Sequence, residues 1–323
     1  MIETKLPAHF DGKRFYNYRT ESSIQKKNLW DFIKWRITRK KYIEEWPKWI
    51  ENNLHSSPET KIDNDTLKAT FINHSTILIQ ISGLNILTDP VWSERVSPFS
   101  WIGPKRIRNP GIEIENLPHI DLVLISHDHY DHLDIKSLKI LHKKFQPTIV
   151  AGSNINSILK KHKLECCELN WWQNIDFKNL KITFLPAKHW SGRKGFYGNN
   201  QTLWGSFAIE SGEKKIYFAG DTAYASHFKT IAETFGGFDL ALIPIGAYKP
   251  EWFMKASHTT PHEAVIIHQE LNSKNSIAIH YGTFRLSDES YDDPINDLKK
   301  SIEDLKPLYP FITLECGESW KID

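Results

Sequence analysis

The chain has 323 residues, of which 40% are hydrophobic and 25% charged, so it is long enough and apolar enough to bury a sizeable core. Its net charge of +2 gives no general electrostatic reason to expect a nucleic acid partner. No apolar run is long enough to cross a membrane, and the N-terminal sequence lacks the apolar stretch of a signal peptide. We therefore expect a cytoplasmic protein with no membrane span.

Histidine, tryptophan and cysteine counts narrow the class of protein further. Fifteen histidines are an excess that is typical of metal binding, and twelve tryptophans suit aromatic-lined pockets, a membrane interface or a large core. The three cysteines include the adjacent pair Cys166 and Cys167, to which we assign no role. An odd total cannot pair completely, so the sequence predicts no disulfide framework and fits a reducing compartment.

The first sixty residues differ in character from the rest of the chain. Residues 28–50 contain four tryptophans, Trp30, Trp35, Trp46 and Trp49. They also contain a basic cluster, Lys34, Arg36, Arg39, Lys40 and Lys41. Three apolar positions fall on one helical face: Trp30, Ile33 and Ile37. Such a segment suits peripheral contact with a membrane surface. The alternative is a helical brace packed on the core. We divide the chain into this N-terminal extension, residues 1–60, and a main domain, residues 61–323. A homodimer formed through the extension is compatible with the sequence but not indicated by it.

From Leu67 on, short apolar runs typical of strands alternate with helical patterns, which predicts a layered α/β domain. Four of these runs each lead to a side chain that can bind a metal. They are residues 122–125 before His127, residues 181–187 before His189, residues 215–220 before Asp221 and residues 276–279 before His280. Sites are usually built on loops at strand ends, so we expect these side chains to converge.

Two helix starts can be placed from capping residues. Asp134 is expected to cap a helix that carries Ile135, Leu138 and Leu141 on one face. The segment from Thr260 to Glu263 has the pattern of a capping box with proline in the first turn, and it opens a helix that runs to about residue 271.

The densest cluster of chemical groups is the segment 126–134, which contains His127, His129, Asp131 and His132. Two histidines at i and i+2 on an extended loop can face one metal, and the following aspartate and histidine can face a second. Imidazole and carboxylate suit zinc, and equally iron or manganese. The absence of cysteine from the cluster argues against a closed structural zinc site.

The pattern His-x-His-x-Asp-His after a strand, followed by a distant His, Asp and His, is similar to that of the metallo-β-lactamase superfamily. The resemblance implies an α/β fold, a four-layer αββα sandwich. It also implies that one metal is held by His127, His129 and His189, a second by Asp131, His132 and His280, and that Asp221 bridges them. A water bridging the metals would supply hydroxide at neutral pH, and Asp131 would also hold it in line. Asp89 and Asp134 are candidate acceptors for the histidine ring nitrogens that face away from the metals.

Several segments resemble one branch, the N-acyl phosphatidylethanolamine phospholipase D group: residues 88–107, 186–193 and 242–254. By this resemblance His258, ahead of the predicted helix 261–271, lines the active site and contacts the phosphoryl group or leaving oxygen. Asn73 replaces the glycine that usually precedes His74, to which we assign no direct role. Five aromatic residues near the ligands are expected to line a channel for acyl chains: Tyr130, Trp190, Tyr248, Trp252 and Phe253. We expect Trp204, by contrast, to pack in the core.

We predict a two-metal hydrolase that uses a metal-bridging hydroxide, with Asp131, Asp221 and His258 as catalytic residues. The predicted activity is that of a phosphodiesterase of phospholipase D type, with a lipid or other small lipophilic phosphodiester as substrate. The predicted cofactors are two divalent metal ions; zinc is the preferred metal, and iron and manganese are the alternatives. The rival enzyme class is a lactone or carboxylic ester hydrolase of the sugar-lactonase branch. A non-catalytic metal-binding scaffold at the membrane is disfavoured, because every ligand position is filled.

Overall fold

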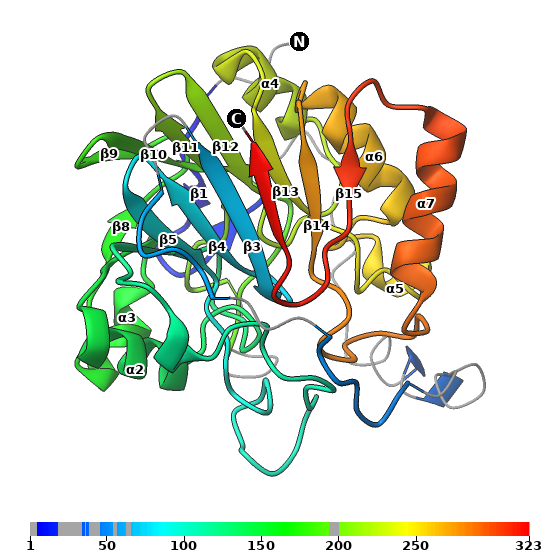
Figure 1. The fold of residues 1–323 in the computed structure, drawn as a ribbon, viewed down its shortest axis with the longest axis horizontal. Helices are drawn as coiled ribbons and strands as arrows, with labels where there is room; N and C mark the ends of the chain where they lie inside the picture. Colours follow the sequence, from blue (N-terminus) through cyan, green and yellow to red (C-terminus); the bar gives the residue numbers. More distant parts are fainter. Residues whose placement is uncertain are drawn as a thin grey trace.

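A computed structural model describes residues 5–18, 34–35, 37–38, 46–53, 57–62, 66–193 and 200–322. Within these residues, two seven-stranded mixed sheets pack face to face, and helices cover the outer face of each (Figure 1). The predicted four-layer αββα sandwich is therefore confirmed. Trp30 and Ile33, on which part of the N-terminal interpretation rests, lie outside the described residues, as do Arg36, Arg39, Lys40 and Lys41.

The strands of the first sheet are, in spatial order, β16 (Ser319–Ile322), β3 (Leu67–Asn73), β4 (Thr76–Ile81), β5 (Leu84–Thr88), β6 (Leu122–Ile125), β7 (Thr148–Gly152) and β8 (Cys167–Leu169). Those of the second sheet are β15 (Phe311–Ile312), β14 (Ser276–Ile279), β13 (Leu240–Pro244), β12 (Lys214–Phe218), β11 (Ser206–Ser211), β10 (Leu180–Leu185) and β9 (Asn174–Phe177). A separate two-stranded ribbon joins β1 (His9–Phe10) to β2 (Phe15–Tyr16). The four strands expected from the sequence correspond to β6, β10, β12 and β14.

The burial of β6 shows why these strands are apolar along their whole length. Leu122 and Leu124 join the core between the two sheets, whereas Val123 and Ile125 join a second cluster beneath the helices of the first sheet. Successive side chains of a strand point to opposite faces, so a strand covered on both faces needs apolar residues at every position. The continuous run 122–125 was therefore a reliable sign of a buried strand.

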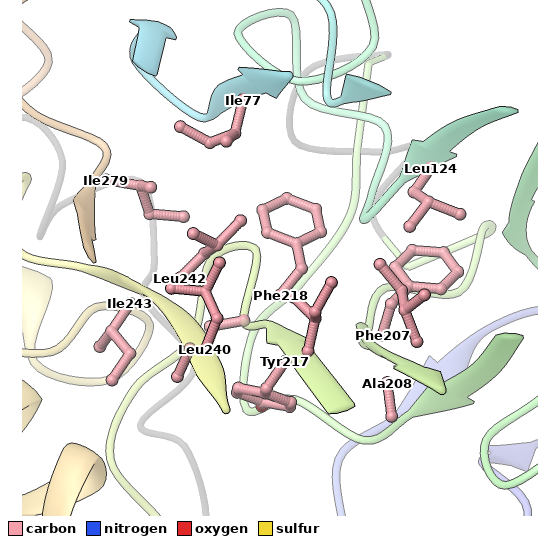
Figure 2. Close-up of a cluster of buried hydrophobic side chains, with 14 of the residues drawn as sticks. Ile77, Leu124, Phe207, Ala208, Tyr217, Phe218, Leu240, Leu242, Ile243 and Ile279 are labelled. Atoms are coloured by element: carbon pink, nitrogen blue, oxygen red, sulfur yellow. The ribbon is translucent and has the colours of Figure 1, made fainter. Parts of the chain in front are cut away.

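The main core lies between the sheets. Figure 2 shows Ile77 of β4 and Leu124 of β6 across from Phe207, Phe218 and Leu242 of the second sheet. Trp204 is also completely buried in this core, as predicted from its sequence context. Two packed sheets of this size provide a rigid base for the loops at their edges.

The helices form the outer layers (Figure 1). The first sheet is covered by α2 (Ile135–Phe145) and α3 (Asn156–Leu159), and the second by α4 (His227–Phe235), α6 (Pro261–Glu270) and α7 (Asp293–Leu305). Short helices η1 (Ile114–Asn116), η2 (Lys160–His162) and α5 (Glu251–Met254) lie in connections. Both predicted caps are confirmed: the Asp134 side chain accepts from Lys136 N, and Thr260 and Glu263 form the capping box. No described helix combines the length and apolar character that crossing a membrane requires.

Part of the N-terminal segment packs on the main domain. The Trp35 indole is buried, donates a hydrogen bond of 2.8 Å to Asp288 and stacks on Phe253 at 4.9 Å. Trp46 donates from Nε1 to the backbone oxygen of Glu289 at 2.9 Å. Among the described tryptophans of this segment, only Trp49 is exposed, at 42%. These contacts favour the brace over the membrane for Trp35 and Trp46.

The two sheets approach each other closely where the metal-type side chains gather. Gly220 follows β12 with a φ of 58°, and a Cβ atom at this position would lie 2.5 Å from the Cβ of Ser126 at the end of β6. Both the left-handed backbone and the lack of space require glycine here. The ends of β6 and β12 are thus brought together directly before Asp221.

A buried histidine in α4 provides a test of pH-dependent stability. His227 is 2% exposed, and burial, followed by Lys188, lowers its pKa to about 3. The unfolded chain binds a proton near pH 6.5, so it holds more protons than the native state between the two pKa values, and stability falls as the pH drops below 6.5. Between pH 7 and pH 5 we expect His227 to account for a loss of about 2 kcal/mol.

The measurement is the free energy of unfolding in urea, at both pH values, for the wild type and His227→Phe, with each protein in the same state of metal loading. The variant keeps an aromatic ring beside Phe228 but cannot titrate. We expect its stability to fall less between pH 7 and pH 5. Equal losses in the two proteins would show that His227 does not carry the effect.

Candidate metal centre

Three histidines form the first of two adjoining pockets. His127 and His129 lie on the loop after β6, and His189 follows β10. His127 Nε2 lies 2.8 Å from His129 Nδ1, which lies 3.3 Å from His189 Nε2. The three ligand atoms lie within 4.8 Å of one another, so one cation can reach all of them. Three imidazole nitrogens are a ligand set that suits zinc and other divalent transition metals.

The second pocket combines a carboxylate with histidines. Asp131 Oδ2 lies 3.5 Å from Nε2 of His132 and 3.5 Å from Nε2 of His280, and His74 Nε2 lies 3.2 Å from the same oxygen. These four side chains also lie within mutual reach of one cation. The pocket thus joins the loop after β6, the end of β14 and the turn between β3 and β4.

Asp221 lies between the two pockets. Its Oδ2 is 3.9 Å and 3.8 Å from Nε2 of His127 and His189, and 3.3 Å and 3.2 Å from Nε2 of His132 and His280. The side chain is buried beyond the end of β12. One carboxylate oxygen therefore faces imidazoles of both pockets, which is the position that a bridging ligand occupies.

Hydrogen bonds behind the pockets orient the histidine rings. Asp89 accepts from Ser126 N at 2.7 Å, and from His132 Nδ1 at 2.6 Å, while His189 Nδ1 donates to the backbone oxygen of Ser257 at 2.8 Å. A ring whose Nδ1 carries the proton presents a free Nε2 lone pair to a metal. These partners therefore select the tautomer that metal binding needs.

The electrostatics of the two pockets differ. Burial lowers the pKa of His129 to about 3 and that of His189 to about 4, so both rings are neutral. In the second pocket burial also acts against charge, but Asp221 and Asp131 raise the pKa of His280 to about 9. The two carboxylates thus favour positive charge in the second pocket, which a divalent cation would supply.

The polar atoms of the site fit a metal centre. Among the described residues, His132 Nε2, His280 Nε2 and Asp221 Oδ1 are buried without a hydrogen-bond partner. A buried polar atom without a partner costs about 1–3 kcal/mol, so such atoms rarely persist in native proteins without a reason. Divalent cations would satisfy these lone pairs, because all three atoms belong to residue types that ligate them.

Asp134, which the sequence suggested as an acceptor for a site histidine, has a different role. Its side chain accepts from Lys136 N, Ser137 Oγ and Ser93 N. It caps α2 and ties the loop after β5 to that helix, and both of its carboxylate oxygens take part in these contacts. Asp89 alone of the two candidates contacts a histidine of the site.

The aromatic residues expected around the ligands divide into two groups. The Trp190 ring lies 4.1 Å from that of His129 and is partly exposed, so it forms a wall of the first pocket. Tyr130 is partly buried beneath the Arg193 guanidinium. His258, with its ring 5.2 Å from His189 and 5.6 Å from His280, faces both pockets.

The other three aromatic residues have described contacts with residues outside the two pockets. The Tyr248 side chain is buried, and its hydroxyl donates to Asp297 of α7. Phe253 stacks on Trp35, and Trp252 is largely exposed beneath the Lys34 ammonium. These contacts tie α5 and its flanks to neighbouring segments, and the place of Tyr248, Trp252 and Phe253 in a channel wall stays a prediction.

Two residues at the site were not assigned a role from the sequence. His74 reaches Asp131 from the turn between β3 and β4. Asn17, in the N-terminal segment, donates from Nδ2 to the backbone oxygen of His189 at 2.9 Å and accepts from His189 N at 3.2 Å. Histidine is a residue type that ligates metals, so its identity was the one sign in the sequence that His74 could belong to the site. Nothing in the sequence near Asn17 indicates its partner.

Asn17→Ala should weaken metal binding in the first pocket, because both backbone groups of His189 lose a partner. We expect a loss of about tenfold or more in affinity, as for other residues that orient ligands. A competition titration with a chromophoric chelator measures this. Asn170→Ala is the matched control, since Asn170 Oδ1 accepts from Ala8 N and Trp171 N away from the metal centre. Equal affinity in Asn17→Ala and wild type would contradict the prediction.

The family model of the β-lactamase superfamily domain matches residues 84–281 of this chain. The chain belongs to the β-lactamase superfamily. The match begins at β5 and ends directly after His280, so it spans Asp89 and all seven predicted metal ligands.

Curated relatives place this superfamily member near one branch. It is 39% identical over 273 residues to the N-acyl-phosphatidylethanolamine-hydrolyzing phospholipase D 1 of Caenorhabditis elegans, covering 79% of this chain and 76% of that protein. It is 36% identical over 242 residues to the mitochondrial protein of the corresponding name in Saccharomyces cerevisiae, where 72% of this chain aligns with only 51% of the relative. An uncharacterised Mycobacterium tuberculosis protein is 37% identical, with 75% of this chain and 65% of that protein aligned. The chain thus spans about half to three quarters of the lengths of these relatives. They confirm the resemblance to the phospholipase D branch.

Solved structures share the fold of this superfamily member. A metallo hydrolase of Ignicoccus hospitalis has a TM-score of 0.60 at 23% identity and covers 80% of this chain and 99% of its own. A possible metal-dependent hydrolase of Veillonella parvula has a TM-score of 0.61 at 16% identity, covering 79% of this chain and 99% of its own. With the family match and the named relatives, the prediction of a metal-dependent hydrolase is confirmed.

Proposed function

We propose that this superfamily member is a two-metal phosphodiesterase of phospholipase D type that acts on N-acyl phosphatidylethanolamine-like or other lipophilic phosphodiesters. The observation that carries the proposal is the similarity to the nematode phospholipase D, at 39% identity over 79% of the chain. The arrangement of the site supports it, because a lipid phosphodiester needs a charged centre for its phosphate beside apolar surface for its chains.

The proposed ligands are His127, His129 and His189 for one cation and Asp131, His132 and His280 for the second, with Asp221 shared between them. Zinc is the proposed metal, since imidazole and carboxylate donors without thiolate suit it, and iron or manganese are the alternatives. Two divalent cations held there would lower the pKa of bound water towards neutrality and offset negative charge that develops on a phosphoryl oxygen.

His258 is the proposed contact for the substrate. Its Nδ1 lies 3.9 Å from Asp221 Oδ2, and its side chain is 14% exposed, more than any of the four histidines nearest to Asp221. The ring therefore lies on the open side of the centre, where it can donate a hydrogen bond to a phosphoryl or leaving-group oxygen. Trp190 beside His129 offers an apolar surface to the adjoining part of the substrate.

The test is a panel of substrates on the metal-loaded full chain. Hydrolysis of N-acyl phosphatidylethanolamine in mixed micelles would add water across the P–O bond to the N-acylethanolamine and leave phosphatidic acid, and both products can be quantified. Bis-p-nitrophenyl phosphate reports phosphodiesterase chemistry without a lipid, and a set of lactones represents the rival class. We expect turnover of the phosphodiesters; turnover of lactones alone would overturn the proposal, and no turnover at full metal loading would favour the scaffold.

We also propose that this protein meets a lipid surface through the loop between β5 and β6, at Phe99, Trp101 and Ile102. These side chains are 54%, 73% and 51% exposed. The basic residues Arg95 and Lys105 form an antiparallel backbone β-bridge at the base of the loop. Val96 of the same loop packs with Phe284 and Tyr130, which places the loop beside the centre. Exposed aromatic and apolar residues next to basic ones suit the interface of a membrane.

The paired substitution Phe99→Ser and Trp101→Ser is expected to reduce co-sedimentation with anionic phospholipid vesicles, while hydrolysis of soluble bis-p-nitrophenyl phosphate is unchanged. Leu308→Ser is the control, because Leu308 is 86% exposed at a distant turn. Unchanged co-sedimentation of the loop variant would remove this role. A change in oligomeric state, measured by light scattering, would instead assign the loop to contact between two copies of the chain.

We propose that the N-terminal extension, residues 1–60, acts as a brace on the main domain, residues 61–323. The contacts of Trp35 with Asp288 and of Trp46 with Glu289 support this. A chain that lacks residues 1–50 would also lose Asn17 and with it the support of His189. Such a truncation would therefore change membrane contact and metal binding at the same time. Single substitutions test the two properties separately.

A further inference from the structure

The turn between β3 and β4 is fixed against the end of β14. His74, at its tip, has a left-handed backbone with a φ of 48°, which costs free energy for a residue other than glycine. His74 N donates to Thr283 Oγ1 at 3.0 Å, and His280 N donates to the backbone oxygen of His74 at 2.8 Å. The backbone of His74 is therefore joined to a proposed metal ligand and to the loop that follows it.

The His74 ring is held as firmly as its backbone. The residue is 1% exposed, its ring packs 4.1 Å from that of His280, and Phe284 meets it edge-on at 5.3 Å. The Phe284 ring in turn packs against the Arg106 guanidinium. In this position His74 Nε2 faces Asp131 Oδ2 at 3.2 Å. A strained backbone and a fully packed ring together aim one nitrogen at one carboxylate.

Asp131 is the proposed ligand that most needs such support. Its side chain is 14% exposed, compared with 2% for Asp221, and it lies on a loop rather than at a strand end. A carboxylate with access to water can turn away from a metal, and a hydrogen bond to the charged oxygen opposes this motion.

We propose that His74 is a positioning residue of the second metal pocket, donating from Nε2 to Asp131 and so holding its carboxylate towards His132 and His280. The inference rests on the proposed metal centre but not on the proposed substrate. The competing arrangement is direct ligation by His74, whose Nε2 also lies within 4.8 Å of the other ligand atoms of this pocket.

Two substitutions separate these arrangements. In His74→Gln, an amide N–H can replace the hydrogen bond to Asp131, whereas His74→Leu removes it. The full chain is titrated with cobalt(II) or zinc in competition with a chelator, and the number and affinity of bound equivalents and the visible spectrum of the cobalt form are recorded. We expect His74→Leu to weaken the second equivalent about 10–100-fold, with the first unchanged, and His74→Gln to retain most of the affinity.

His268→Leu controls for the loss of a buried histidine, because His268 is bonded to Ser276 Oγ and to the backbone oxygen of Tyr309, away from the centre. It should lose stability but bind both equivalents normally. Wild-type affinity in His74→Leu would overturn the inference, and so would His74→Gln losing the second metal as fully as His280→Ala, which would make His74 a ligand. No substrate enters these measurements, so failure to hydrolyse phosphodiesters would leave their outcome unaffected.

Discussion

Replacing Asp221 with asparagine is expected to abolish binding of at least one metal and to reduce hydrolysis of bis-p-nitrophenyl phosphate by more than about a hundredfold, because residues that merely orient ligands already contribute 10–100-fold. Asp221 Oδ2 lies 3.2–3.9 Å from imidazole nitrogens of both pockets. Asparagine offers a single neutral oxygen, and its amide group would place N–H donors against nitrogens that have to coordinate a cation. The measurements are kcat/KM and metal equivalents by elemental analysis.

Asp239→Asn is the matched control for this change. Asp239 precedes β13 in the same sheet, and its carboxylate accepts from Lys215 N and Lys274 Nζ. The pair with Lys274 is partly exposed, so its loss should cost no more than about 1 kcal/mol of stability. We expect full metal content and near wild-type activity. An Asp221→Asn protein with two bound equivalents and unchanged kcat/KM would contradict the bridging role proposed for Asp221.

Asp89→Asn is expected to lower metal affinity or activity by about 10–100-fold, although Asp89 itself touches no proposed metal position. Asp89 Oδ2 accepts from both Ser126 Oγ and His132 Nδ1. If the amide of asparagine occupies that position, it donates to Nδ1, and the proton of His132 moves to Nε2. A protonated Nε2 cannot bind a cation, so the substitution acts through the tautomer of the ring.

Asp134→Asn distinguishes this effect from a general loss of order. Asp134 is also buried and also accepts three hydrogen bonds, but they come from the start of α2 and the loop after β5. Asparagine can still cap α2, so the loss is of the hydrogen bonds from Ser93 and Ser137 to Asp134 Oδ2. It should cost about 1–3 kcal/mol of stability, with metal affinity unchanged. Equal effects of the two variants on metal affinity would contradict the assigned role of Asp89.

The strands that lead to the site and the proposed metal ligands at their ends could largely be anticipated, because both depend on local sequence. The run 122–125 is apolar at every position because β6 is covered on both faces, and His127 must then emerge at the edge of the sheet. The same reasoning applies at Asp221 and His280. The arrangement of the sheets came instead from the resemblance to a known family, since nothing in the strand patterns specifies which strands pair.

The contacts that could not be anticipated depend on distant segments or on unusual backbone. Asn17 and His189 are 172 positions apart, and a lone asparagine carries no sign of its partner. His74 reaches the centre from a turn in which its φ is 48°, and nothing in the surrounding sequence indicates that left-handed conformation. Tyr248 lies close in sequence to the site residues, yet its hydroxyl bonds to Asp297, since neighbouring residues after a strand can face in opposite directions.

The proposed ligands come from both sheets: His127 and Asp131 from the first, and His189, Asp221 and His280 from the second. A cation held by both groups would bind tightly only when the sheets are packed together, since the unfolded chain cannot bring these residues to one point. Free metal then becomes a thermodynamic partner of folding, and at a concentration of 100 times Kd it would add about 2.7 kcal/mol to stability. The thermal midpoint of this protein should therefore depend on the free metal concentration at which it is measured. In cells short of metal, the protein would have a lower free energy of unfolding.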